Sequence, residues 1–244
     1  MMNEAASVKM PYAVIGMALL LLAVLIGASK LPQIEAGPNP TGDKTGDSIW
    51  KHPNLTLAAI GIFSYVGAEV SIGSAMTNFL HEPDMLNVPL EEAGKLVSYY
   101  WGGAMVGRFI GSGLLTMFRA HRLLAVFALG ACLLCLAVTQ LHGSTAAYLA
   151  LSIGLFNSIM FPVIFTLTLE RSSAAPAATS GLLCLSIVGG AILPYIYGLI
   201  ADAAGLHTAY FLPAVAYAAI ALIALAAAGA KIYAHGTTAA SAGH

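Results

Sequence analysis

Long apolar runs constrain this chain more than any other feature of its sequence. A helix needs about 20 apolar residues to cross a bilayer, and these runs lack the alternation of apolar and polar residues that marks a β-barrel strand. Only 9% of the residues are charged, too few to cover a water-soluble surface. The sequence therefore predicts an all-α, polytopic membrane bundle. Its seven transmembrane helices are expected at 12–29, 55–80, 96–118, 123–141, 145–169, 177–200 and 208–230.

A long polar connector divides these helices unequally. Residues 30–54 are rich in Pro, Gly, Asp and Lys, a composition typical of a linker. A lone helix at 12–29 would follow a short tail at 1–11. A six-helix bundle at 55–230 would follow the linker and end in a second tail at 231–244.

Positive charges predict the orientation. When the helices alternate sides, only Lys9 and Lys95 fall on one side of the membrane, and the other side is cytoplasmic by the positive-inside rule. The cytoplasmic set is Lys30, Lys44, Lys51, Arg119, Arg122, Arg171 and Lys231. The N-terminus would then lie outside and the C-terminus inside, which suggests that a further segment precedes Met1. Alternatively, the first run is a signal peptide, because Lys9 precedes an apolar core that ends in Ala-Ser-Lys.

Two pairs of similar segments suggest an internal repeat. AIGIFSYV (59–66) is similar to SIGLFNSI (152–159), and GGAMVGR (102–108) is similar to GGAILPY (189–195). The pairs occur in the same order in two successive units of three helices. This order is expected of the inverted 3+3 repeats within each half of a major facilitator transporter.

One carboxylate and one guanidinium lie deep inside predicted spans. Glu69 is near the middle of FSYVGAEVSIGSAMTNFL (63–80), and Arg108 is about halfway along 96–118. A charge in the bilayer core costs several kcal/mol and is usually kept only where it faces a bundle interior or a wet cavity. We therefore expect the two to interact, directly or through water or a substrate. Alternatively, Arg108 reaches the cytoplasmic headgroups along its helix.

Other residues in the spans suit a sugar ligand. The amide of Asn157 offers donors and an acceptor to hydroxyl groups, and Phe161 offers an apolar face on which a pyranose ring can lie. Tyr65 and Trp101 add a hydroxyl and an indole N–H. Alternatively, Asn157 bonds a neighbouring helix, and an aromatic residue at a span end belongs to the interfacial belt.

Glycines and prolines predict close packing and weak points. Gly103, Gly107 and Gly111 form a smooth stripe against which another helix can pack closely. Broken or kinked helices at matching places in two repeats point to a transport site. The residues that mark such places are Pro162 in the fifth span and Gly189, Gly190 and Pro194 in the sixth.

The same residues argue against several enzyme classes. An intramembrane serine protease needs a His within a span, and an aspartyl protease needs two buried acids, whereas Glu69 is the single acid inside the predicted cores. A retinal protein needs a Lys midway along its last helix, but Lys231 is at the end. Cys132 and Cys135 have apolar flanks and are expected to be buried thiols. The sequence predicts a transporter rather than an enzyme, with no cofactor, no metal and no nucleic-acid partner; a channel is harder to exclude.

Four long blocks lie on four of the six helices between 55 and 230: YVGAEVSIGS (65–74), YYWGGAMVGRFIGS (99–112), GLFNSIMFP (154–162) and IVGGAILPYIYGLIAD (187–202). They resemble the sugar–proton symporters of the major facilitator superfamily, in the group of fucose, galactose and glucose permeases. Glu69 favours the glucose/galactose branch, since fucose permeases more often have an amide at this position.

The resemblance covers the C-terminal half of such a transporter. Residues 12–29 resemble its sixth helix, 31–53 its central cytoplasmic loop, and 55–230 its helices seven to twelve. In the family, the acids that carry the coupling proton lie in the first half. We therefore expect Glu69 to contact substrate or act in gating rather than carry the proton.

The resemblance implies half of a secondary active transporter in a bacterial inner membrane. Its partners would be a hexose such as glucose or galactose, the coupling proton of the full-length protein, the lipid bilayer and a separate N-terminal half. The residues implied to face the central cavity are Glu69, Arg108 and Asn157, followed by Tyr65, Trp101 and Phe161. Alternatives are half of a fucose or other sugar permease, and a non-transporting membrane partner that complements a separately made N-terminal half.

Overall fold

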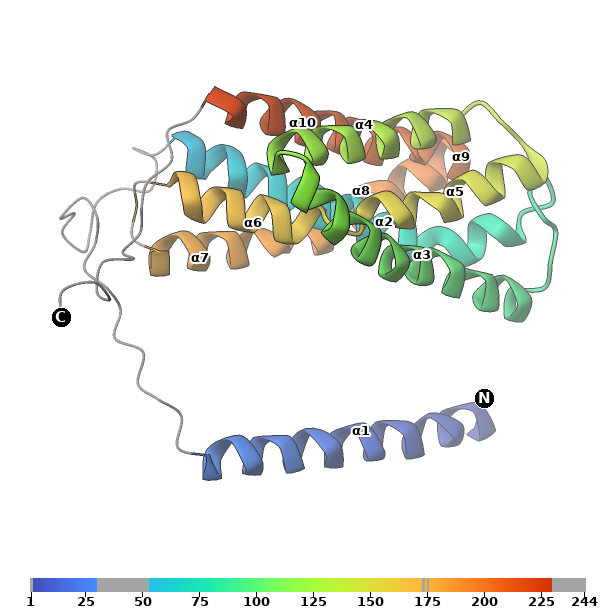
Figure 1. Ribbon diagram of the computed structural model, residues 1–244. Helices are drawn as coiled ribbons and strands as arrows, with labels where there is room; N and C mark the ends of the chain where they lie inside the picture. The colour runs from blue at the N-terminus through green and yellow to red at the C-terminus, as the bar shows by residue number, and fades with distance from the viewer. Residues whose placement is uncertain (1, 30–52, 173, 175, 230–244) are drawn as a thin grey trace, which may run out of the picture. The chain divides into compact units, whose positions relative to one another are not determined.

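A computed structural model describes residues 2–29, 53–172, 174 and 176–229, and every regular element within these ranges is a helix (Figure 1). The predicted all-α fold class is therefore confirmed. The chain divides into two units, Met1–Gly37 and Pro38–His244.

The first unit contains a single apolar helix, α1 (Met2–Ala28). It begins well before the predicted span at 12–29, because Glu, Ala, Lys and Met near the start of the chain are strong helix formers. The tail expected at 1–11 is thus helical from its second residue. Most of the expected linker at 30–54 and the whole tail at 231–244 lie outside the described residues.

The second unit is a helical bundle in which three of the six predicted spans are broken. Its first three helices are continuous: α2 (Pro53–His81), α3 (Leu90–Met117) and α4 (Ala120–Val138). The fifth predicted span of the chain is divided into α5 (Gly143–Asn157) and α6 (Met160–Arg171). The sixth comprises α7 (Pro176–Leu185), the 3-10 turn η2 (Ser186–Val188) and α8 (Gly189–Ala204), and the last comprises α9 (Leu206–Ala209), α10 (Phe211–Ala226) and η3 (Ala227–Gly229).

Local sequence explains several of these ends. Pro53 occupies the first position of α2, where a missing N–H costs nothing. Two acids, Glu91 and Glu92, lie in the first turn of α3, where the helix dipole favours negative charge. Gly205 has a φ of 88° and ends α8 in a conformation that a side chain would strain.

Five stretches of the described chain are long and apolar enough to cross a membrane: Pro53–His81, Ala120–Val138, Gly143–Arg171, Pro176–Ala204 and Leu206–Gly229. The apolar part of α1, Tyr12–Ala28, is shorter. Although α3 is 28 residues long, it is not in this set. Its glycines, its aromatic residues and Arg108 make it less apolar than its neighbours, as suits a helix that packs against protein and faces a polar recess.

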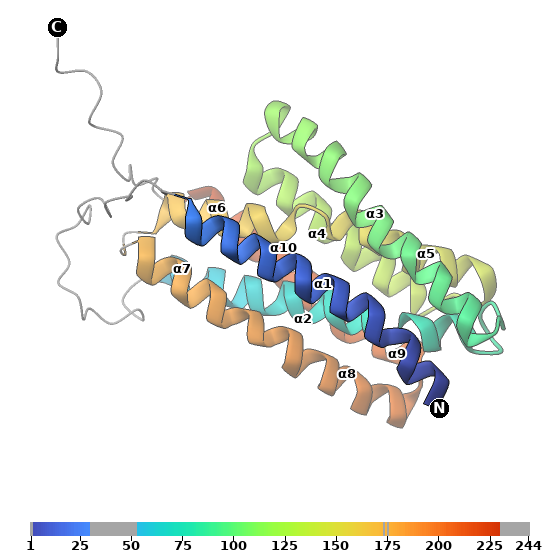
Figure 2. The ribbon, with the colours of Figure 1, turned by 90° about the horizontal axis from the view of Figure 1, so that it is seen from below.

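Two helix pairs cross at glycines (Figures 1 and 2). Where α3 packs along α5, a methyl group at Gly107 would meet the Leu155 carbonyl and lie 2.6 Å from Ser158 Oγ. Where α2 packs along α8, a methyl group at Gly189 would meet the backbone of Phe63. Both crossings therefore depend on the missing side chain, which lets the helix backbones approach closely.

The predicted weak points differ in how they fold. The break between α5 and α6 lies at Ser158 and Ile159, one turn before Pro162, because proline has no N–H for the Ser158 carbonyl. In the sixth span, η2 ends just before Gly189, and α8 continues through Pro194. The glycine pair rather than Pro194 therefore marks the irregular turn.

Candidate functional site

A recess of ≈ 490 Å³ lies where α2, α3, α6 and η2 face one another. Four of the six residues expected to face a cavity line it: Tyr65, Glu69, Arg108 and Phe161. Val66, Pro162 and Ile187 complete its lining. The recess combines an acid, a base, a phenol and an aromatic face, whereas most of the bundle surface is aliphatic.

Glu69 is held in the recess by its own helix. Tyr65 lies one turn earlier on α2, and its hydroxyl donates a 2.7 Å hydrogen bond to Glu69 Oε1. The same hydroxyl is 3.1 Å from the backbone oxygen of Asn157. With one proton to donate, it favours the shorter, charge-assisted bond to the carboxylate. Glu69 Oε2 is left to accept a hydrogen bond from another group.

Arg108 faces the same recess from α3, and its side chain is exposed. Among the described residues, it forms no ion pair with Glu69 within 4.0 Å. Both side chains line the recess, so a polar ligand there could accept a hydrogen bond from Arg108 and donate one to Glu69.

Phe161 supplies the aromatic side of the recess. Its ring centroid lies 6.3 Å from that of Tyr65 and 6.0 Å from that of Phe165, on which it stacks. These neighbours fix the plane of the ring. The break that precedes Pro162 places this side chain at the beginning of α6.

Asn157 does not line the recess, because it is fully buried behind it. Its Nδ2 donates a 2.7 Å hydrogen bond to the hydroxyl of Tyr100, which in turn donates a 3.2 Å bond to the backbone oxygen of Glu69. Asn157 Oδ1 has no hydrogen-bond partner among the described residues. In this conformation the amide joins α5 to α3, which is the alternative that its sequence position left open.

Trp101 also lies outside the lining of the recess. Its ring packs edge-on against Tyr100 at 5.1 Å, and a methyl group at Gly73 would lie 2.9 Å from Trp101 Cζ2. The indole therefore covers a glycine of α2 and is still 48% exposed. This position fits packing between α2 and α3 better than contact with a ligand in the recess.

Tyr100 is a site residue that sequence reasoning did not select. It neighbours Trp101 in an aromatic cluster, and single-chain periodicity gives no reason to prefer one of the pair. Its ring is fully buried, and its hydroxyl links Asn157 to the backbone of Glu69. The sequence alone could not have identified Tyr100, because its position depends on the close approach of α3 to Gly154 of α5.

The arrangement suits reversible binding of a neutral polyhydroxylated ligand better than bond chemistry. Glu69 accepts hydrogen bonds, Arg108 donates them, and Phe161 offers an apolar face. Among the residues described, no group of three or more His, Cys, Asp or Glu could hold a metal ion. The described Cys132 and Cys135 are free and buried.

Comparisons with known proteins show what the chain as a whole is similar to. The chain is 44% identical over 222 residues to a glucose/galactose transporter of Brucella abortus, a match that covers 91% of this chain and 54% of that relative. It is 31% identical over 229 residues to the L-fucose-proton symporter of Escherichia coli, covering 89% of this chain and 51% of that protein. The chain thus spans about half the length of the curated relatives it matches. No protein-family model matches it.

The bundle is also similar to a solved transporter structure. The major facilitator superfamily transporter FucP, in an outward conformation, matches with a TM-score of 0.74 and 25% identity. The match covers 91% of this chain and 55% of FucP. Sequence and structure therefore match the same C-terminal half of these proteins.

Proposed function

The chain is a homologue of the C-terminal half of major facilitator sugar transporters, and from this premise we propose that it forms one half of a hexose transporter. Glucose or galactose is the proposed substrate class, because the 44% identical relative is a glucose/galactose transporter. Proton coupling is proposed for the full-length protein, since the Escherichia coli relative is a symporter of L-fucose and protons.

One observation carries this proposal: Glu69, Arg108, Tyr65 and Phe161 line one recess although they come from three different helices. A hexose is neutral, carries hydroxyl groups around its ring, and has apolar C–H faces. The free oxygen of Glu69 would accept from one hydroxyl, and Arg108 would donate to another. Phe161 would lie against a C–H face of the sugar.

The recess is open on one side, as expected of half of a binding site. In a full transporter, the two halves would rock about a sugar held between them near the middle of the membrane. We propose that Asn157 and Tyr100 position Glu69 from behind and do not touch the sugar. By the distribution of positive charge, the ends that carry Arg119, Arg122 and Arg171 would face the cytoplasm of a bacterial cell.

Uptake measurements test the proposal directly. The chain is joined to the N-terminal half of the Brucella abortus relative and expressed in cells without hexose uptake. We expect saturable uptake of labelled glucose or galactose that an uncoupler abolishes. Glu69→Gln should weaken sugar binding about tenfold or more, since a hydrogen bond to a charged group contributes about 1.5–3 kcal/mol.

Lys95→Gln provides the matched control. Lys95 is exposed at the start of α3, where it pairs with Glu91 at 2.8 Å, so its loss should leave uptake unchanged. Wild-type affinity in both Glu69→Gln and Arg108→Gln would show that the recess does not bind the sugar. Uptake of fucose in preference to glucose and galactose would reassign the substrate and keep the site.

A further inference from the structure

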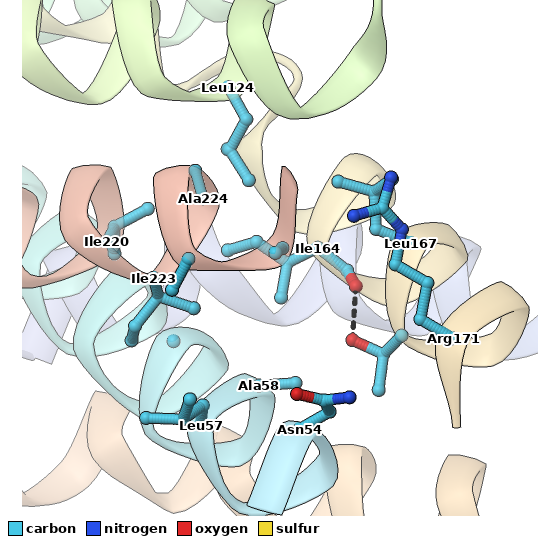
Figure 3. A pocket seen from close by; sticks show the side chains of 14 residues that line it. Asn54, Leu57, Ala58, Leu124, Ile164, Leu167, Arg171, Ile220, Ile223 and Ala224 are labelled. Atoms are coloured by element: carbon cyan, nitrogen blue, oxygen red, sulfur yellow. Dashed lines mark hydrogen bonds between the residues drawn. The ribbon is translucent and has the colours of Figure 1, made fainter. Parts of the chain in front are cut away.

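A second pocket lies between one set of ends of α2, α4, α6 and α10 (Figure 3). It encloses ≈ 50 Å³ and shares no lining residue with the recess around Glu69. Its walls are mainly aliphatic, with Leu124, Ile164 and Ile220 among them. Two strongly polar side chains, Asn54 and Arg171, lie at one side of it, opposite Ile220 (Figure 3).

Two hydrogen-bond donor atoms of Arg171 lack an acceptor among the described residues. These atoms, Nε and Nη1, are both buried. A buried, charged donor without an acceptor costs more than the roughly 1–3 kcal/mol lost by a neutral one. The planar guanidinium presents its donors as a fork, which matches the oxygens of a carboxylate or phosphate. The pocket is therefore built to place an anion beside Arg171.

Among the described residues, the charges that act on His121 at this end are all positive. Arg171, Arg122 and Arg119 lie close enough for their charges to act on His121, which is buried at the start of α4. The described carboxylates form no ion pair with any of these three arginines. The nearest acid along the helix, Glu170, points outward and is exposed. Arg171 thus lines the apolar pocket, and Arg119 and Arg122 lie near His121 at the start of α4.

We propose that this end of the bundle binds the phosphate group of an anionic phospholipid. The phosphate would accept hydrogen bonds from Arg171, while Arg119 and Arg122 balance the negative charge of the headgroup. The apolar pocket would receive the uncharged part of the lipid next to the phosphate. Basic pockets between transmembrane helices on the cytoplasmic side commonly bind such headgroups. Because the pocket touches four helices, the lipid would hold their ends together.

Native mass spectrometry of the purified chain tests this site. The protein is exchanged into detergent that contains either phosphatidylglycerol or phosphatidylcholine, and bound lipid is counted. We expect selective retention of phosphatidylglycerol. Each removed charge should weaken binding about fivefold, since one Lys or Arg near an anionic lipid contributes about 1 kcal/mol. Arg171→Gln should have the largest effect, and Arg171→Lys should restore part of the binding.

Two further variants keep the test independent of folding. Arg122 is exposed, so Arg122→Gln should fold normally and still bind phosphatidylglycerol more weakly. Lys95→Gln removes an exposed charge that is not in the pocket lining and should change nothing.

Three results would overturn the proposal. The first is equal retention of the two lipids, and the second is unchanged retention in both Arg171→Gln and Arg122→Gln. The third is displacement of phosphatidylglycerol by millimolar inorganic phosphate, which would show that the site binds soluble phosphate instead.

Discussion

Both glycine crossings of the bundle bring a glycine against a backbone carbonyl of the facing helix, and they differ in chemistry. At the first, Gly154 of α5 faces the Tyr100 carbonyl of α3; at the second, Gly189 of α8 faces the Phe63 carbonyl of α2. The sequence repeat pairs the second span with the fifth and the third with the sixth. The α2–α8 crossing is therefore the counterpart of the α5–α3 crossing.

The difference between them lies in their polar side chains. The α3–α5 crossing contains the hydrogen bond between Asn157 and Tyr100, which continues to the backbone of Glu69. The α2–α8 crossing places aliphatic side chains such as Val66 and Leu193 next to its glycines. The two repeats thus both have a close helix crossing at a glycine. The hydrogen-bonded pair of polar side chains occurs at the α3–α5 crossing, and its counterpart between α2 and α8 has aliphatic side chains next to the glycines.

The largest expected loss of stability comes from adding a methyl group at either glycine crossing, and comparing the two losses tests whether the helices approach equally closely. In Gly154→Ala and Gly189→Ala, the new methyl group would meet a backbone carbonyl, which cannot move aside cheaply. Each variant should lose about 1–3 kcal/mol of unfolding free energy, as overpacked cores do. Denaturation in detergent micelles, followed by circular dichroism, measures the loss.

Matched controls lie on the same two pairs of helices. A methyl group at Gly102 of α3 or Gly198 of α8 would meet nothing within 4 Å. Alanine at these positions should be neutral or slightly stabilising, because it is the better helix former. If Gly189→Ala behaves like these controls, the two crossings are not equivalent in packing.

An effect of similar size or smaller should appear at the α3–α5 crossing alone. Tyr100→Phe leaves the buried Nδ2 of Asn157 without its partner, which should cost about 1–3 kcal/mol of stability. Asn157→Leu in the same chain should cost less than the sum of the two single changes, since the pair is lost only once. Thermal unfolding of the single and double variants measures this coupling.

Tyr197→Phe on α8 is the control. The Tyr197 hydroxyl makes a long 3.4 Å bond to the Leu206 carbonyl, so its removal should have a much smaller effect. Additive losses in the Tyr100 and Asn157 variants would mean that the two side chains act separately, and the proposed support for Glu69 would fail.

The smallest effect on stability is expected from Pro162→Ala at the break between α5 and α6. The change restores an N–H for the Ser158 carbonyl, and it also raises the entropy of the unfolded chain by about 0.4–1 kcal/mol. These contributions oppose each other, so stability should hardly change. Hexose binding should weaken, because a straightened helix moves Phe161. Unaltered affinity would mean that the break does not position the aromatic face.

Much of the fold was predictable from local sequence. Six apolar spans after the linker correspond to the helices of the bundle, and Glu69, Arg108, Tyr65 and Phe161 do meet at one recess. The broken helices were less predictable. Proline and glycine mark where a helix is weak, but the packing of neighbouring helices decides whether it breaks, and α8 remains helical through Pro194.

The sequence alone determined that this protein is a bundle of membrane helices, because apolar runs of this length must satisfy their backbone hydrogen bonds locally. It also showed that two charged residues, Glu69 and Arg108, lie inside predicted membrane spans, where a charge is usually kept for a function. Only the tertiary structure decided which polar side chains reach the recess. Tyr65 meets Asn157 across 92 residues of chain, and Asn157 meets Tyr100 across 57. These contacts depend on the rotation and crossing of whole helices, which the glycines at the crossings allow, and no local pattern records them.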